Sequence, residues 1–210
     1  MTGDMKRIAC LLLAATSLAA ADAGWTSLFN GKDLTGWKPN ENPATFSVQD
    51  GAIVAHGPHS HCFYVGSFHN HTFKDFELKV DIMTKPNSNG GVYIQTEYQD
   101  KGFPDKGFEV QVNNTYNTDP RRTGSLYEVA DNAKEVAKDD QWFTEDILAK
   151  GDTITVKVDG KLVAQWTQPA DWKGTKDFAG RRIGAGTIAL QAHDPGSIVY
   201  YKNIRIKLLP

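Results

Sequence analysis

Several short segments of the chain alternate between apolar and polar residues, a pattern typical of β-strands with one buried face. In residues 76–82 (FELKVDI) every second residue is apolar. Similar alternation is found in residues 91–98 (GVYIQTEY), 107–112 (GFEVQV), 153–158 (TITVKV), 161–166 (KLVAQW), 187–191 (TIALQ) and 198–208 (IVYYKNIRIKL). The pattern therefore predicts a chain built mainly of strands.

Turn residues separate these segments and indicate how the strands connect. Asp159-Gly160 joins two alternating segments, and a two-residue Asp-Gly link of this kind predicts a tight β-hairpin. Helical periodicity is scarce, and only residues 131–139 fit one or two helical turns. Strands roughly ten residues apart, separated by Gly, Pro, Asn and Asp, predict an all-β sandwich or barrel, and strands at both ends of the domain are typical of a jelly-roll sandwich.

Composition and charge narrow the class of protein. The 210 residues are 40% hydrophobic and 23% charged, which is ordinary for a globular domain. The formal net charge is −2, so no excess of basic residues indicates a nucleic-acid partner. No linker-like or repeated segment divides the chain, and we expect a single folded domain.

The N-terminal residues have the pattern of a secretory signal peptide. Lys6-Arg7 precedes an apolar run of about 14 residues that ends at the A-x-A sequence Ala21-Asp22-Ala23. This run is shorter than a membrane span requires, and no other segment is long and apolar enough to be transmembrane. A buried N-terminal helix is the alternative. We expect residues 1–23 to be removed, residues 24–210 to form the domain, and the protein to be secreted or periplasmic.

Two predicted strands place polar side chains together on one face. Glu109 and Gln111 lie two residues apart in GFEVQV, as do Gln191 and His193 in LQAH, and residues two apart in a strand point to the same side. A carboxylate and an amide on one face can bind a sugar, and an imidazole at a strand end can transfer a proton or ligate a metal. A solvated outer face and a hydrogen-bonded rim histidine are the alternatives. Glu109 and His193 together form the best candidate for a reactive pair.

Five of the six histidines fall within residues 56–71. The two His-x-His pairs in this stretch would each share a strand face if extended, and with an acidic residue they could bind a transition metal. Polar loops around a strand at residues 62–65 (CFYV) are the simpler interpretation, because no zinc-binding motif is present. His56 is a candidate for ligand binding, because Gly57 allows the chain to turn toward a site.

A further set of segments carries motifs that occur together in a known family. These segments are 24–37 (GWTSLFNGKDLTGW), 76–78 (FEL), 89–93 (NGGVY), 107–111 (GFEVQ), 123–127 (TGSLY), 186–193 (GTIALQAH) and 201–206 (YKNIRI). In this order they resemble the 3-keto-disaccharide hydrolase domain family over residues 24–209. The resemblance implies a concanavalin A-like, laminin-G-like jelly-roll β-sandwich of two antiparallel sheets.

The same resemblance implies an exported enzyme that acts on 3-keto-glycosides. A ketone at carbon 3 of a sugar acidifies the hydrogen on carbon 2, so a base can remove it; the group on carbon 1 then departs and water adds. The reaction needs a base, an acid and an electrophile for the enolate, and a divalent metal ion or an arginine would serve as that electrophile. We expect Glu109 or His193 to act as base or metal ligand, Tyr127 or His193 as acid, and Gln111 and Arg122 as sugar-binding residues.

Two departures from the family pattern bear on substrate choice. Gln95 stands where many relatives carry arginine, and Trp142 begins a WFT segment where W-N is common. Together with Gln191 and His56, these residues complete the candidate sugar-binding set. A non-catalytic, lectin-like carbohydrate-binding module is the alternative function, and a structural domain cut from a larger cell-envelope protein is a third.

The spacing of carboxylates argues against one common mechanism of glycoside cleavage. Jelly-roll hydrolases of the laminarinase type carry E-x-D-x-x-E on one strand, which supplies a nucleophile and an acid. The comparable strand here, residues 109–113 (EVQVN), has a single carboxylate. The chain also has no G-x-S-x-G elbow, P-loop or dinucleotide-binding fingerprint. Ordinary double-displacement chemistry is therefore poorly supported.

Overall fold

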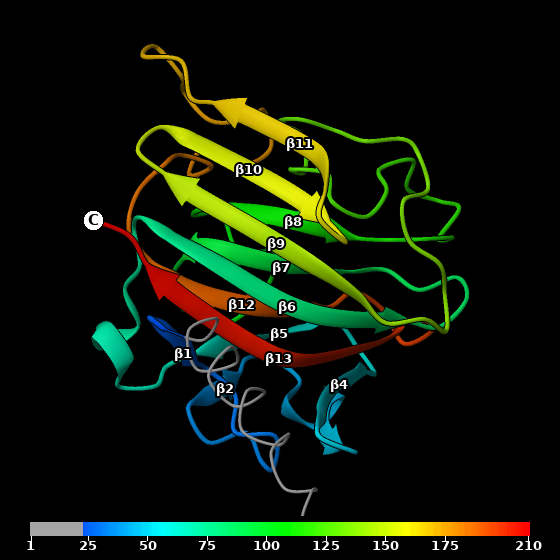
Figure 1. Cartoon of the computed structure of the whole chain (residues 1–210). Helices are drawn as coiled ribbons and strands as arrows, with labels where there is room; N and C mark the ends of the chain where they lie inside the picture. Colours follow the sequence, from blue (N-terminus) through cyan, green and yellow to red (C-terminus); the bar gives the residue numbers. More distant parts are fainter. Residues whose placement is uncertain (1–22) are drawn as a thin grey trace, which may run out of the picture.

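The computed structural model describes residues 23–210, which form a sandwich of two antiparallel β-sheets (Figure 1). The larger sheet has the order β11-β10-β9-β6-β13-β4-β3, with β1 paired to β13, and the smaller sheet has the order β2-β5-β12-β7-β8. The predicted sandwich of two antiparallel sheets is confirmed. The predicted signal peptide lies, except for Ala23, outside the described residues.

The strands of the larger sheet are β1 (Trp25–Ser27), β3 (Phe46–Gln49), β4 (Ala52–His56), β6 (Phe76–Thr84), β9 (Phe143–Lys150), β10 (Thr153–Val158), β11 (Lys161–Thr167) and β13 (Ile198–Leu208). Those of the smaller sheet are β2 (Trp37–Pro39), β5 (Ser60–Tyr64), β7 (Gly90–Thr96), β8 (Phe108–Val112) and β12 (Thr187–Ala192). Two 3-10 helices, η1 (Pro43–Thr45) and η2 (Phe68–His71), lie in the connections. Within residues 23–210, no helix is long and apolar enough to span a membrane.

One connection is the hairpin that its turn residues predict, and another is a loop where the sequence pattern predicted helical turns. Asp159 and Gly160 adopt φ values of 48° and 75° between β10 and β11, as the predicted two-residue hairpin requires. The helical turns predicted for residues 131–139 are wrong, because this segment is a loop. Its Asp139 carboxylate accepts hydrogen bonds from the hydroxyl groups of Thr84 (2.7 Å) and Thr115 (2.6 Å), which ties the loop to β6 instead.

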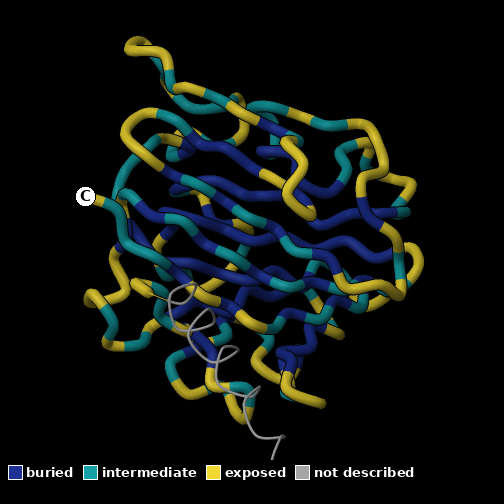
Figure 2. Tube along the Cα trace, in the orientation of Figure 1, coloured by how far each residue is buried: buried dark blue, intermediate teal, exposed yellow. Residues whose placement is uncertain are grey.

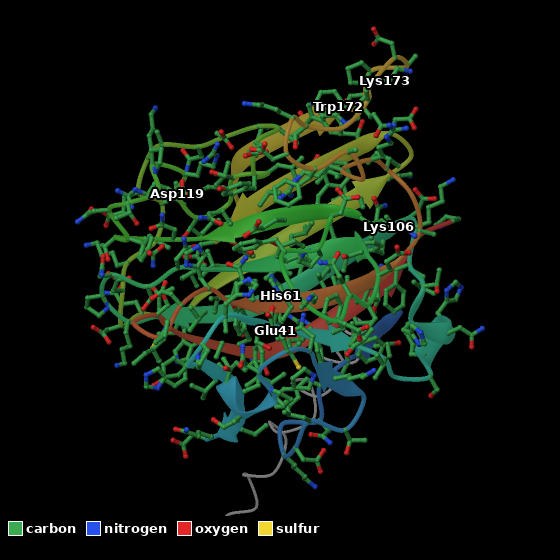
Figure 3. The ribbon with its side chains drawn as sticks, turned by 180° about the vertical axis from the view of Figure 1, so that it is seen from behind. Glu41, His61, Lys106, Asp119, Trp172 and Lys173 are labelled. Carbon is green, nitrogen blue, oxygen red and sulfur yellow. The ribbon has the colours of Figure 1, made fainter. Side chains whose placement is uncertain are left out.

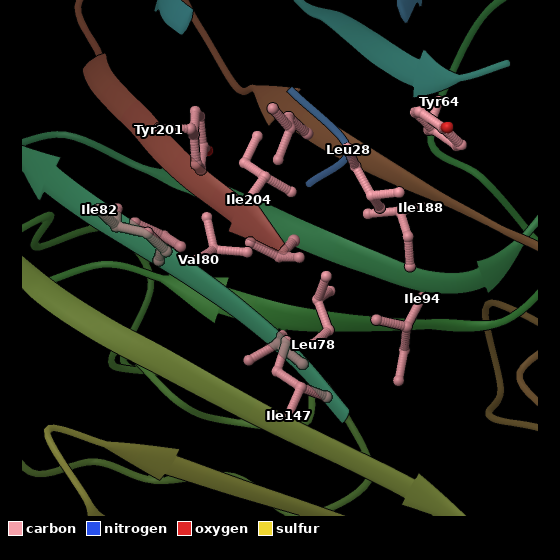
Figure 4. Close-up of a cluster of buried hydrophobic side chains, with 14 of the residues drawn as sticks. Leu28, Tyr64, Leu78, Val80, Ile82, Ile94, Ile147, Ile188, Tyr201 and Ile204 are labelled. Atoms are coloured by element: carbon pink, nitrogen blue, oxygen red, sulfur yellow. The ribbon is translucent and has the colours of Figure 1, made fainter. Parts of the chain in front are cut away.

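The main core lies between the two sheets. Alternate residues of β6, such as Leu78 and Ile82, are fully buried, while the residues between them are partly exposed. They belong to the same apolar cluster as Ile94 of β7 and Ile188 of β12 (Figure 4). Burial is greatest along the middle of the strands and lowest in the loops at their ends (Figure 2). Strand alternation therefore determines which side chains of each strand point into the core between the sheets.

The smaller sheet is buried on both faces. Every residue of β7, β8 and β12 is buried, whereas β6 and β9 alternate between buried and partly exposed positions. The side chains of β8 that point away from the main core are Glu109 and Gln111, and they too are buried. The outer face of this sheet is therefore covered by loops, and polar groups are enclosed there.

Candidate functional site

A cavity of about 80 Å³ lies between the outer face of the smaller sheet and the loops that cover it. The residues lining it are Asn89, Phe103, Glu109, Gln111, Asp119, Tyr127, Phe178, Gln191 and His193. Figure 3 views the molecule from this side, with His61 near the middle of the sheet and Asp119 on a covering loop. The structure thus brings together five of the residues proposed from sequence: Glu109, Gln111, Tyr127, Gln191 and His193.

The Glu109 carboxylate is held in place by side chains of β7 and β12. Its Oε2 accepts a hydrogen bond from the Tyr93 hydroxyl (2.8 Å), and its Oε1 accepts one from Nε2 of Gln191 (3.0 Å). The residue is only 4% exposed, and this burial raises the pKa of its carboxyl group. The positive charge of Arg181 opposes that rise, as do the hydrogen bond from Tyr93 and the nearby His193.

Strand register explains how Glu109 reaches across the sheet. Tyr93 of β7 pairs with Glu109 of β8, and Gly91, two residues earlier, pairs with Gln111. The carboxylate lies over Gly91: a Cβ atom built there would be 2.7 Å from Oε1 of Glu109. Glycine at this position therefore makes the space in which Glu109 meets Gln191 of β12.

Arg181 is a candidate functional residue that sequence reasoning missed. It is 1% exposed, and Nη2 of its guanidinium lies 3.6 Å from Oε2 of Glu109. None of its three side-chain nitrogens has a hydrogen-bond partner in the protein. The guanidinium carbon lies 4.2 Å from the ring centre of Phe178 and 5.4 Å from that of Tyr127, and both rings line the cavity. A buried cation with free donors is an arrangement that can receive a developing oxyanion.

The loop between β11 and β12 carries Arg181 to the site. The indole nitrogen of Trp172 donates to the backbone carbonyl of Arg181 (2.7 Å), and the amide of Gly180 donates to the Asp105 carboxylate (3.2 Å). The available sequence signal was the length of this connection, because long ordered loops in compact domains are commonly functional. Nothing in the local pattern separates Arg181 from the neighbouring Arg182.

His193 follows the last residue of β12 and is partly exposed at the cavity. Its Nδ1 lies 2.8 Å from Oδ2 of Asp194, which also accepts a hydrogen bond from the hydroxyl of Ser197 (2.8 Å). Partial burial would raise the pKa of the Asp194 carboxyl, but the hydrogen bonds from His193, Ser197 and the amide of Gly196 lower it below its usual value. An ionised Asp194 accepts a hydrogen bond from Nδ1–H, which leaves Nε2 of His193 for a ligand.

Tyr127 lines the cavity but is tied to an arginine of the loop. Nη1 of Arg121 donates to the Tyr127 hydroxyl (3.4 Å), and the guanidinium carbon lies 4.3 Å from the ring centre. Burial and the nearby Asp119 raise the pKa of Tyr127 to about 12. A phenol with this pKa is a poor proton donor near neutrality, so stacking or hydrogen bonding to a ligand suits it better.

Two other proposed sugar-binding residues have structural partners. Nη1 of Arg122 donates to the side chain of Asn113 and to the backbone carbonyl of Tyr116, both at 3.0 Å, and so holds the loop after β8. Gln95 donates to the backbone carbonyl of Lys74 (2.8 Å) and accepts from an amide of the β11–β12 loop. Neither residue lines the cavity. The structure thus corrects their expected location, because both side chains connect loops.

The remaining sequence candidates lie away from the cavity. His56 is exposed at the end of β4, and its backbone pairs with Ile198. Trp142 is 41% exposed just before β9, where Nζ of Lys202 lies 3.7 Å from its ring centre. The second His-x-His pair lies in η2 and is exposed, so it shares no strand face. None of these residues lines the cavity.

The donor set does not fit a metal ion. Within residues 23–210, no three His, Cys, Asp or Glu side chains converge as metal ligands. The two candidate ligands from sequence, Glu109 and His193, are already committed to Tyr93 and Gln191 and to Asp194, respectively. The positive charge beside Glu109 comes from Arg181. The sequence left a divalent metal ion and an arginine as the two possible electrophiles, and the structure places an arginine beside Glu109.

The sequence pattern of the 3-keto-alpha-glucoside-1,2-lyase-like domain matches residues 24–207. The chain belongs to this family. The match spans every strand of both sheets and includes all the residues that line the cavity. The family resemblance found in the sequence is thus confirmed. The comparison with curated proteins gave no match.

Solved structures show the same architecture. A protein from Parabacteroides distasonis described as a putative glycosyl hydrolase is 26% identical, with a TM-score of 0.76, and the match covers 93% of this chain and 98% of that one. The carbohydrate-binding module CBM66 from Bacillus subtilis is 13% identical, with a TM-score of 0.56 and coverage of 88% and 95%. A Bacillus subtilis protein with a galectin-like fold is 10% identical, with a TM-score of 0.64 and coverage of 87% and 94%. The family and these matches connect the chain with carbohydrate-related proteins, while the two Bacillus proteins support the fold alone.

Proposed function

We propose that this protein binds a 3-keto-glycoside in the cavity beside Glu109 and cleaves it by elimination followed by hydration. The proposal rests on one observation: the buried guanidinium of Arg181, which has no hydrogen-bond partner in the protein, lies 3.6 Å from Oε2 of Glu109. In a 3-keto sugar, the ketone oxygen and the acidic hydrogen sit on neighbouring carbon atoms. A base and an oxyanion-binding cation must therefore be neighbours in the site, as these two groups are.

Each step has a group of the right kind. Glu109 removes the proton from carbon 2, and the electron pair of that C–H bond forms an enolate whose oxygen is stabilised by Arg181. The enolate then reforms the ketone and expels the oxygen on carbon 1, which takes a proton from Nε2 of His193. The product has a double bond between carbons 1 and 2. Water adds across this bond, with hydroxide on carbon 1 and a proton on carbon 2, so the net reaction is hydrolysis of the glycoside.

The electrostatics support this division of roles. Burial raises the pKa of Glu109, which makes its carboxylate a stronger base than an exposed one. The Asp194 carboxylate, 2.8 Å from Nδ1 of His193, holds the imidazole through Nδ1 and leaves Nε2 for proton transfer to the leaving oxygen. The base is thus buried beside Arg181, whereas the acid lies partly exposed beside Asp194.

The amide side chains provide acceptors for the hydroxyl groups of a sugar. Oε1 of Gln111 and Oε1 of Gln191 are buried and have no hydrogen-bond partner in the protein. Their amide nitrogens are used within the site: Gln111 donates to the Asn89 side chain (3.2 Å), and Gln191 donates to Glu109. These contacts fix the orientation of both amides and leave the carbonyl oxygens for ligand hydroxyl groups.

Exchange of the hydrogen on carbon 2 with deuterium from the solvent reports the first proposed step, and sugar release reports the later cleavage. We would incubate the purified protein with a 3-keto-disaccharide in D2O and follow both deuterium incorporation and sugar release by NMR. Wild type should show both. Glu109→Gln should lose both by about 100-fold or more, because the base is gone, whereas His193→Ala should retain exchange and lose cleavage. His56→Ala changes an exposed histidine outside the cavity and serves as the matched control.

Two outcomes would contradict the proposal. If wild type binds the ketosugar but neither exchanges nor cleaves it, the lectin-like alternative is favoured. If Glu109→Gln is folded and exchanges the hydrogen at the wild-type rate, Glu109 is not the base. We further propose that the protein works after export, which determination of the N-terminus of the secreted protein would test.

A further inference from the structure

A second hollow, which the chemistry above does not use, lies on the outer face of the larger sheet. It has a volume of about 470 Å³, within the range typical of small-molecule sites, and its lining residues are Trp25, Ser27, Asn203 and Arg205. These residues belong to β1 and β13, or to the irregularity within β13, in the sheet nearer the viewer in Figure 1. The cavity beside Glu109 lies on the outer face of the other sheet. The two sites are therefore separate, and we call the second one the Trp25 hollow.

Strand register builds this hollow from two short segments. Trp25 pairs with Lys207, and Ser27 pairs with Arg205. Residues two apart in a strand point to the same side, so the side chains of each segment share one face of the sheet. That face is the solvated one, because Ile206, between Arg205 and Lys207, is fully buried in the core. The register thus places an indole ring beside basic side chains at the surface.

Positive charge gathers around the indole ring. Lys79 of β6 pairs directly with Arg205, and both side chains point outward. The Trp25 ring centre lies 4.9 Å from Nζ of Lys79 and 5.5 Å from the guanidinium carbon of Arg205. Like charges opposite one another in a sheet cost stability, and Glu77 (3.0 Å) and Asp146 (3.4 Å) offset part of this cost by binding Lys79. Among residues 23–210, no acidic side chain lines the hollow itself.

Asn203 brings an amide to the hollow through an irregularity in β13. The register shifts between Lys202 and Arg205, and Asn203 adopts a φ of 49° at this shift. Bulges of this kind re-aim a side chain, and residues held at positive φ are found most often where a site needs them. The amide nitrogen of Asn203 donates to Asp81 (2.7 Å). This contact fixes the side chain and leaves its carbonyl oxygen as an acceptor for a hydroxyl group.

Taken together, these groups match one class of ligand. The flat indole offers apolar area for a sugar ring, a guanidinium binds a carboxylate through two parallel hydrogen bonds, and amide and hydroxyl oxygens accept from sugar hydroxyl groups. A phosphate or sulfate ion would use the cation alone, and a neutral sugar would leave the cation unused. A sugar that carries a carboxylate uses every group of the lining.

We infer that the Trp25 hollow binds a uronic acid unit of an acidic polysaccharide, with its carboxylate on Arg205 and its ring against Trp25. Asn203 and Ser27 accept hydrogen bonds from its hydroxyl groups. Because the hollow and the cavity beside Glu109 lie on opposite outer faces of the sandwich, the bound unit is not the sugar that is cleaved. The hollow instead holds the protein on a polymer, and this inference is independent of the proposed function.

Calorimetry with trigalacturonate as the probe tests the site at physiological salt, where unspecific attraction between exposed charges is screened. Wild type should bind trigalacturonate at least about tenfold more tightly than its uncharged methyl ester. Arg205→Gln should weaken trigalacturonate binding at least about tenfold, because charge-assisted hydrogen bonds are lost, and should change binding of the ester less than about twofold. Lys202→Gln is the matched control: this cation also lies over a tryptophan, with Nζ 3.7 Å from the ring centre of Trp142, but outside the hollow.

A second measurement observes the indole ring in the unsubstituted protein. The N–H signal of the Trp25 indole, assigned by its absence in Trp25→Phe, should shift in NMR spectra when trigalacturonate is added, while that of Trp142 should not. No binding by wild type, an equal loss in Lys202→Gln or an unshifted Trp25 signal would overturn the site. Binding to vesicles of anionic lipid without binding to trigalacturonate would overturn it in favour of a membrane surface. Ketosugar cleavage by Arg205→Gln should equal that of wild type, so failure of this inference leaves the proposed function standing.

Discussion

The contact between Arg181 and Glu109 predicts a stability change that depends on pH. Replacement of Arg181 by Met keeps much of the side-chain volume and removes the charge 3.6 Å from Oε2 of Glu109. At that separation, an effective dielectric constant of 20 gives an attraction of about 5 kcal/mol, and breaking a buried ion pair typically costs about 3–5 kcal/mol. We therefore expect Arg181→Met to lower the free energy of unfolding by several kcal/mol when Glu109 is ionised.

The pH dependence follows from the direction of the Glu109 pKa. Burial raises this pKa above the value of 4.5 for an ordinary glutamate, so the contribution of Glu109 to stability is greatest at low pH and falls as its carboxyl ionises with rising pH. Loss of Arg181 raises the pKa further. The variant should thus differ less from wild type near pH 4.5, on the acid side of the raised pKa, than near pH 8, where more of the Glu109 carboxyl is ionised.

Urea unfolding at both pH values, followed by tryptophan fluorescence, measures this difference. The same substitution in a Glu109→Gln background is the control, because glutamine carries no charge for Arg181 to stabilise. We expect the excess cost near pH 8 to disappear in that background. If Arg181→Met costs the same at both pH values, or the same in the Glu109→Gln protein, then Arg181 acts through packing against Phe178 and Tyr127 and the electrostatic argument fails.

Three further predictions address other parts of the chain. Gly91→Ala would place a methyl group 2.7 Å from Oε1 of Glu109 and so displace the carboxylate. Ketosugar cleavage should therefore fall at least about tenfold, while the far-UV circular dichroism spectrum stays unchanged. Full activity of this variant would refute the role of the glycine. Glu145 is fully buried in the core-facing row of β9, and burial raises its pKa well above its usual value. Glu145→Met should therefore stabilise the protein by about 1–3 kcal/mol in urea unfolding at pH 8 and by less near pH 4.5, and an unchanged or lower stability would contradict this. Mass spectrometry of the exported protein should find Gly24 at its N-terminus, and an intact residue 1 would exclude cleavage.

The sequence predicted strands best where every second residue is apolar. The segment 76–82 and the hairpin around Asp159-Gly160 match β6 and the β10–β11 turn. The same rule missed β9, because Glu145 occupies a core-facing position between Phe143 and Ile147 and so breaks the apolar pattern. Because of this one buried acid, the apolar pattern did not predict a strand that lies in the middle of the larger sheet.

Half of the candidate site could be predicted by the same reasoning. Glu109 and Gln111 share a face because a strand repeats every two residues, and this holds wherever the strand lies. That Glu109 meets Gln191 depends on β7 lying between β8 and β12, a relation between distant segments that no local pattern contains. The sequence also suggested a solvated outer face as an alternative, but loops from three connections bury it.

The two arginine pairs of the chain show most clearly what sequence alone leaves undecided. Arg121-Arg122 and Arg181-Arg182 both lie in loops rich in polar residues, and from sequence Arg122 was the natural choice for the site. In the structure the two arginines differ in their partners: Arg122 is hydrogen-bonded to Asn113, whereas Arg181 is buried against Glu109 with its donors free. A guanidinium enclosed without hydrogen-bond partners costs stability, and we expect such a cost to persist where the free donors serve a ligand.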